Sequence, residues 1–203
     1  MKIILFGGSG FIGKNVMKKF PKNSIVPISL RADEWKNNLP SDTEVFINLI
    51  GKAHDHEGRA SYADYYEANV ELTKQIFSEF FKSKAQLLIH ISSIAALEEL
   101  ESPYPLKEED FNNPLSHYGK TKREAEVWLL NQHLPKEKKI IILRPPLVHV
   151  ERDKGNLGLL YKFISKGIPY PLSAFENSRS FLSMDNFIFF LKEIISNQDK
   201  LDS

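Results

Sequence analysis

Short apolar runs alternate with longer stretches of helical periodicity through the first 150 residues. The runs are typical of strands buried on both faces of a sheet, and they lie at 3–6, 25–30, 45–50, 87–91 and 140–143. The periodic stretches predict helices at 11–20, 64–82 and 118–134, with a short helical piece at 32–39. Strands and helices that alternate in this way predict an α/β fold with a parallel, doubly wound sheet.

The pattern weakens after residue 150. Helical periodicity returns at 157–165 and at 185–196, and the segment PYPL between them is expected to be extended. We therefore predict a main domain over residues 1–150 and a smaller lobe over residues 151–203.

Composition narrows the class of protein without identifying its chemistry. The formal net charge of +1 gives no strong field that would recruit nucleic acid or an anionic membrane. The chain has no cysteine, which excludes disulfides, thiolate metal sites and cysteine nucleophiles. No apolar run reaches transmembrane length, and the N-terminus does not have the pattern of a signal peptide. We therefore expect a cytoplasmic protein.

A glycine cluster follows the first predicted strand and opens the first helix. Gly7, Gly10 and Gly13 are spaced by three, which allows a tight turn and a close approach of backbone to ligand. The helix that follows offers unpaired amides and the positive end of its dipole to a pyrophosphate. A Gly-Lys-Ser/Thr ending is missing, which disfavours a nucleoside-triphosphate loop. The context favours dinucleotide binding over an ordinary glycine-rich turn.

In a sheet of this kind, ligands bind at the carboxyl ends of the strands. The residues that follow strands, and should gather there, are Ser9, Ile50, Ser92 and Pro145. Arg31 follows the second strand, where an arginine accommodates a 2′-phosphate, and it therefore favours NADP(H). NAD(H) stays open, because Asp33 lies close by and Arg31 could be an ordinary surface residue.

Tyr118 and Lys122 are four residues apart and share one face of a predicted helix. A nearby cation favours a phenolate, so Lys122 is expected to lower the pKa of Tyr118 toward a value useful for proton transfer. A hydroxyl of Ser93, at the end of the fourth strand, could hydrogen-bond the reacting oxygen. Taken alone, a tyrosine and lysine at this spacing are common by chance.

In this order, the motifs resemble the extended short-chain dehydrogenase/reductase family of nucleotide-sugar epimerases, dehydratases and reductases. The segments that carry the resemblance are GGSGFIG, Asn69 in the long helix, Ser92-Ser93, Tyr118 to Lys122, RPPLVHV, KGNLGLL, GIPYPL and RSFLSMDN. The later segments are similar to the bacterial UDP-glucose 4-epimerase-like subgroup, which includes reductases of UDP-4-keto-6-deoxy-N-acetylhexosamines. The resemblance implies a Rossmann-like dinucleotide-binding domain over 1–150 and a nucleotide-sugar-binding lobe, partial here, over 151–203.

The resemblance also implies a role for each matching residue. Ser93, Tyr118 and Lys122 would form the catalytic triad, and Ser93, Asn156, Leu157 and Arg179 would bind substrate. With Arg31, the cofactor-binding residues would be Gly7, Gly10, Phe11, Ile12, Gly13, Leu49, Ile50, Gly51, Asn69, Tyr118, Lys122 and Pro145. Arg144 would lie near the nicotinamide.

The implied activity is reduction of a 4-keto UDP-sugar with NADP(H), in surface polysaccharide biosynthesis. The alternatives are a UDP-sugar 4-epimerase that holds NAD tightly and a non-catalytic dinucleotide-binding module. Relatives in this family also pair through helices, which allows a homodimer through the region of Phe77, Phe80 and Phe81.

The sequence departs from the family pattern in four places. Ala96-Leu97-Glu98 replaces the usual valine-tyrosine-glycine, and His149-Val150 replaces a tyrosine-glycine. The interval between Arg31 and Val45 is short, so one customary strand is expected to be missing. Family members usually continue beyond the helix that follows MDN, so part of the substrate lobe would be absent here.

His54 and His56 are interpreted as a polar loop at the rim of the site, not as metal ligands.

Overall fold

The computed structural model describes residues 1–32, 34–53, 59–100, 102, 104–110, 113–150, 156–168 and 178–201. The His54 and His56 pair and the PYPL segment that sequence analysis singled out lie outside the described residues.

Five parallel strands form the central sheet. They are β1 (Ile3–Phe6), β2 (Ile25–Ile28), β3 (Val45–Asn48), β4 (Leu87–Ile91) and β5 (Lys139–Leu143), in the order β2-β1-β3-β4-β5. Every neighbouring pair is parallel, which confirms the predicted fold class. The strand order reverses between β1 and β3, and this switch point is where such sheets bind ligands.

As expected, the described part of the interval between Arg31 and Val45 contains no strand. β3 pairs directly with β1, and the described part of the interval between β2 and β3 contains a 3₁₀ turn, η1 (Trp35–Asn38). The buried Trp35 ring anchors this turn by an edge contact with Phe6, 5.7 Å between ring centroids.

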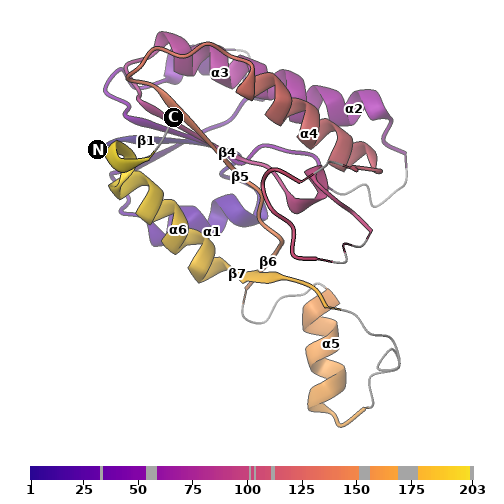
Figure 1. Ribbon diagram of the computed structural model, residues 1–203. Coiled ribbons are helices and arrows are strands. Elements are labelled where there is room, and N and C mark those ends of the chain that lie inside the picture. The colour runs from indigo at the N-terminus through magenta and orange to yellow at the C-terminus, as the bar shows by residue number, and fades with distance from the viewer. Residues whose placement is uncertain are drawn as a thin grey trace.

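Helices cover both faces of the sheet (Figure 1). One face carries α1 (Phe11–Lys19) and α6 (Met184–Ser196), and the other carries α3 (Leu72–Lys82) and α4 (His117–Leu130). α4 ends four residues earlier than predicted, and Gln132 Nε2 donates to the Trp128 carbonyl, 2.7 Å away, which satisfies an acceptor of the last turn.

The long helix predicted over 64–82 is three segments instead of one. α2 (Tyr62–Tyr66) begins at a capping box in which Ser61 accepts from the Asp64 amide and Asp64 accepts from the Ser61 amide. A π-helical turn, η2 (Glu67–Glu71), separates α2 from α3. Such turns add a residue to the helical repeat and are frequent at functional sites.

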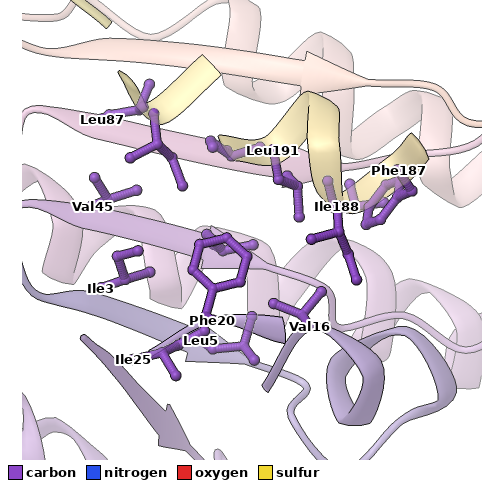
Figure 2. Packing of buried hydrophobic residues seen from close by; sticks show 14 of the residues in the cluster. Ile3, Leu5, Val16, Phe20, Ile25, Val45, Leu87, Phe187, Ile188 and Leu191 are labelled. Atoms are coloured by element: carbon purple, nitrogen blue, oxygen red, sulfur yellow. The ribbon is translucent and has the colours of Figure 1, made fainter. Parts of the chain in front are cut away.

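Each face of the sheet has its own apolar core. Figure 2 shows the α6 face, where Phe187, Ile188 and Leu191 of α6 lie over side chains of the sheet and of α1. The opposite core includes Phe46, Phe80 and Leu129, from β3, α3 and α4. Phe187, Ile188 and Leu191 are therefore part of the core of the main sheet, although α6 belongs to the 151–203 segment.

A second, two-stranded sheet follows β5. β6 (Leu147–His149) pairs in parallel with β7 (Phe181–Ser183), and neither strand was predicted, because three residues carry too little periodicity. α5 (Asn156–Ser165) projects from the body beyond this pair (Figure 1). Across the described residues, no helix combines the length and apolar character needed to cross a bilayer.

Candidate active site

The glycine turn after β1 packs directly against the end of β3. Gly7 has a positive φ of 83°, and a Cβ there would lie 2.9 Å from the carbonyl carbon of Leu49. A Cβ on Gly13 would lie 2.3 Å from the Gly7 oxygen. The turn is closed by the Gly10 amide, which donates to the Gly7 carbonyl at 3.1 Å. A side chain at either position would collide with the protein's own backbone, so this close packing of the turn requires glycine.

Gly10 occupies the N-cap of α1 with extended backbone, so the first amides of α1 face the carboxyl edge of the sheet without a capping side chain. Together with the closed turn, this end of α1 suits a pyrophosphate. Phe11 is half exposed and Ile12 is partly buried in the core, where they would flank such a ligand.

The β3 end is shaped by a buried asparagine that sequence analysis missed. Asn48 Oδ1 accepts from the Ile50 amide at 2.9 Å, and the Asn48 amide nitrogen lies 3.1 Å from both Thr73 Oγ1 and His90 Nδ1. This network fixes the backbone of Leu49 and Ile50 against Gly7. The only available sequence signal is a polar residue closing an otherwise apolar strand.

Asn69 connects the β3 loop to α4. It lies in the π turn, is fully buried, and its Oδ1 accepts from the Lys52 amide at 2.7 Å. Its Nδ2 donates to Thr121 Oγ1 at 2.9 Å, one residue before Lys122. Gly51 lies between these groups, since a Cβ there would be 3.2 Å from Asn69 Oδ1 and 3.6 Å from Lys122 Nζ. The π turn thus aims Asn69 into the site.

The Ser93 segment is held by the end of β5. The Ser92 amide donates to the Leu143 carbonyl at 2.7 Å, and the Ile94 amide donates to the Pro145 carbonyl at 3.2 Å. Ser93 itself caps a short 3₁₀ turn, η3 (Ile94–Ala96), by accepting from the Ala95 amide. These bonds, with the Gly7 contact to Leu49, bring the strand ends together as the sequence predicts.

Tyr118 lies in the first turn of α4, beside Ser93. Burial raises the pKa of the Tyr118 phenol, a hydrogen bond with Ser93 opposes that effect, and the Glu99 carboxylate adds to it. The pKa shift is therefore upward, contrary to the lowering expected from Lys122, because desolvation of the phenolate outweighs the hydrogen bond with Ser93.

Lys122 is fully buried one turn further along the same helix face. Its Nζ donates to the Ile91 carbonyl at 2.6 Å, at the end of β4. Burial lowers the pKa of Lys122 to about 8, and the Glu126 carboxylate opposes that shift. A buried lysine with a depressed pKa thus lies one helical turn from a buried phenol, in the region that Gly51 borders, and such perturbed groups are typical of functional sites.

The remaining predicted residues lie around this centre. Arg31 is exposed just beyond β2, where it could meet the ribose end of a ligand. Asn156 and Leu157 begin α5, and exposed Arg179 precedes β7, so all three belong to the part of the chain beyond β6. The guanidinium of Arg144 donates to Glu126 of α4, one turn beyond Lys122.

The comparisons with known proteins agree with this geometry. The sequence matches the model of the NAD dependent epimerase/dehydratase family over residues 3–200. UDP-glucose 4-epimerase of Vibrio cholerae is 29% identical, over 92% of this chain and 64% of its own length. The N-acetyl-alpha-D-glucosaminyl-diphospho-ditrans,octacis-undecaprenol 4-epimerase of Escherichia coli O157:H7 is 26% identical, over 96% and 63%. The chain thus spans just under two thirds of the length of these relatives.

Solved structures show the same fold. UDP-N-acetylglucosamine 4-epimerase from Methanobrevibacter ruminantium M1 superposes with a TM-score of 0.77 at 19% identity, covering 93% of this chain and 70% of the other. UDP-glucuronic acid 4-epimerase from Bacillus cereus, in complex with NAD, gives 0.73 at 23% identity, covering 97% and 73%. With its glycine turn, its Ser-Tyr-Lys arrangement and a family match over nearly its whole length, this chain belongs to the NAD-dependent epimerase/dehydratase family.

Proposed function

We propose that the protein binds a nicotinamide dinucleotide at the carboxyl edge of the sheet and transfers hydride at C4 of a UDP-sugar. The observation that carries the proposal is the joining of two features at one edge: a glycine turn too tight for any side chain, and a buried lysine beside a phenol and a serine. The named activities of the relatives supply the class of substrate.

The residues present fit a dinucleotide. Gly7, Gly10 and the first turn of α1 would hold its pyrophosphate, and Leu49 to Gly51 would line its adenosine side. Lys122 would hold the nicotinamide ribose, with Asn69 and Pro145 fixing the surrounding backbone. When bound, the nicotinamide supplies the hydride acceptor or donor.

The chain's own residues would then handle the proton. Tyr118 would exchange a proton with the oxygen on C4, and Ser93, hydrogen-bonded to Tyr118, would orient that oxygen. The raised pKa of Tyr118 keeps the phenol protonated at neutral pH, which suits a general acid. Asn156, Leu157 and Arg179 would contact the sugar nucleotide from the smaller lobe.

Two outcomes of this chemistry are separable. Arg31 at the end of β2 supports NADP(H) and net reduction of a 4-keto sugar, while the relatives named as 4-epimerases support NAD and a hydride that returns to the other face. A reductase releases one oxidised cofactor for each keto sugar consumed. An epimerase interconverts two UDP-sugars with no net change in cofactor redox state.

Thermal unfolding with NAD, NADPH and several UDP-sugars tests the binding part of the proposal. A ligand that binds only the native state at a hundredfold excess over its Kd stabilises it by about 2.7 kcal/mol. We expect one dinucleotide and at least one UDP-sugar to raise the melting temperature. If neither dinucleotide does so at millimolar concentration, the proposed function is wrong.

We also propose that two copies pair through α2, α3 and α4. Phe77 and Phe80 are buried in the core, as expected of packing residues, but Phe81 and Val127 are exposed on the outer surface of these helices. A hollow of about 350 Å³ lies there, bordered by Tyr66 and Trp128 among other residues. Sedimentation equilibrium measures the association directly, and Val127→Glu should abolish it.

A further inference from the structure

A fully buried carboxylate lies on the catalytic face of α4, one turn beyond Lys122. Glu126 accepts two hydrogen bonds from the guanidinium of Arg144, with Nε–Oε1 at 2.9 Å and Nη2–Oε2 at 2.8 Å. Arg123 Nη1 donates to the same Oε2 at 3.0 Å. The third nitrogen of Arg144 donates to the Glu108 carbonyl at 3.2 Å, so the fork is fixed in direction.

Arg144 lies in the stretch of backbone that holds the Ser93 segment in place. Arg144 lies between Leu143 and Pro145, whose carbonyls accept from the Ser92 and Ile94 amides, respectively. The backbone on either side of Arg144 therefore holds the segment that carries Ser93. The side chain of Arg144, through Glu126, holds the helix that carries Tyr118 and Lys122.

Glu126 follows Tyr118 and Lys122 at intervals of four, so all three share one face of α4. The Glu126 carboxylate also raises the pKa of Lys122 against the effect of burial, which shows that the two side chains lie close together. The pair thus connects the segment that carries Ser93 to the helix that carries Tyr118 and Lys122.

Stability alone does not account for the pair. Buried ion pairs can often be replaced by apolar residues of similar volume at no loss of stability, because desolvation cancels the Coulombic gain. A bidentate arginine–carboxylate contact differs from apolar packing in that it fixes both the distance and the orientation of its two partners. Orientation is what a site built from three separate elements requires.

We propose that Glu126 is a positioning residue that, through Arg144, holds Ser93 in register with Tyr118 and Lys122. It touches neither substrate nor cofactor in this arrangement; it acts through the segments it joins. The catalytic meaning of the clamp rests on the proposed function, whereas its structural effect on the Ser93 segment does not.

Amide hydrogen exchange tests the clamp without any substrate. Glu126→Gln keeps the shape of the side chain but removes its charge, and Arg144→Lys keeps the charge but removes the fork. In both variants, we expect the Ser92 and Ile94 amides to exchange about tenfold faster than in the wild type, beyond any change at Leu5 in β1.

Ile195→Ala is the matched control. Ile195 is buried in the core at the far end of α6, near the start of β5, where Lys139 Nζ donates to the Gln198 carbonyl. The cavity should lower the melting temperature, but it should raise exchange at Ser92 and Leu5 together. If Ser92 and Leu5 also change together in Glu126→Gln and Arg144→Lys, the clamp does not exist.

Turnover supplies the second measurement. With the assay well below the melting temperature, Glu126→Gln should lower kcat about tenfold or more and leave the KM for the UDP-sugar and the Kd for the dinucleotide within about twofold. Ile195→Ala should keep the wild-type kcat. Unchanged kcat in Glu126→Gln would overturn the positioning role. A wild-type protein without turnover would instead count against the proposed function, and the exchange result would still decide the clamp.

Discussion

Lys122→Met should make the protein more stable at neutral pH while it abolishes turnover. The substitution replaces a fully buried ammonium with an apolar side chain of similar length. Burial lowers the pKa of Lys122 from its ordinary 10.5 to about 8. The folded protein therefore holds this proton less tightly than the unfolded chain does, and a proton retained at neutral pH opposes folding.

The magnitude follows from that pKa difference. Between pH 8 and 10.5 the unfolded chain binds the proton and the folded chain releases it, so wild-type stability rises with pH by about 1.4 kcal/mol per unit. Below pH 8, where both states hold the proton, the buried ammonium destabilises the folded state by about 3 kcal/mol. The hydrogen bond from Lys122 to the Ile91 carbonyl offsets about 1 kcal/mol, which leaves Lys122→Met about 2 kcal/mol more stable near neutrality.

Urea unfolding of the wild type and Lys122→Met, from about pH 7 to about pH 9.5, measures the effect. The stability advantage of the variant should stay constant up to about pH 8 and then shrink by about 1.4 kcal/mol per unit. Lys120→Met is the control, because Lys120 is exposed on the same helix and its removal should give a difference that does not vary with pH in this way. If the stability difference between Lys122→Met and the wild type is also independent of pH, burial does not lower the pKa of Lys122.

Three further predictions test other parts of the structure. Gly7→Ala should cost about 2 kcal/mol or more in unfolding free energy and weaken dinucleotide binding, because it combines a positive φ with a Cβ 2.9 Å from Leu49; Gly167→Ala, with a φ of 69° and open space around it, should cost only the conformational part, about 1 kcal/mol. Lys138→Met should lower the unfolding free energy by about 2 kcal/mol without changing kcat, because Lys138 Nζ donates to three backbone carbonyls in and just after the last turn of α3. Arg31→Ala should raise the Kd for NADPH about tenfold and leave that for NAD unchanged; equal effects on both would mean that Arg31 does not read the 2′-phosphate.

The periodicity of the sequence was sufficient to predict the sheet and its helices. Apolar runs such as Ile3–Phe6 are buried on both faces, and this pattern has few structural alternatives. The π turn at Glu67–Glu71 was out of reach, because one extra residue in a helix leaves only a small phase shift in the apolar pattern. β6 and β7 were missed because their three-residue pairing depends on contact between distant segments.

The candidate site was predictable where a motif fixes local geometry and not where burial sets the chemistry. The glycine spacing predicted the tight turn before α1, and the Tyr118–Lys122 interval predicted that these two residues share one helix face. The predicted direction of the pKa shift of Tyr118 was wrong, because desolvation depends on how deeply the phenol is buried, and the sequence does not show that. The ion pair of Arg144 with Glu126 was not predicted, because Glu126 lies on another element and a single sequence does not show such pairings.

The most direct test of the central claim compares the wild type with Tyr118→Phe. Purified protein is mixed with UDP-glucose or UDP-N-acetylglucosamine and either NAD or NADP, and the absorbance of reduced nicotinamide and the identity of the sugar are followed in one turnover. The wild type should form reduced nicotinamide transiently, or interconvert the sugars, with at least one pair. Tyr118→Phe should bind the same ligands but slow this step at least about a hundredfold. Equal rates in the two proteins would contradict proton transfer by Tyr118 and the active site described above.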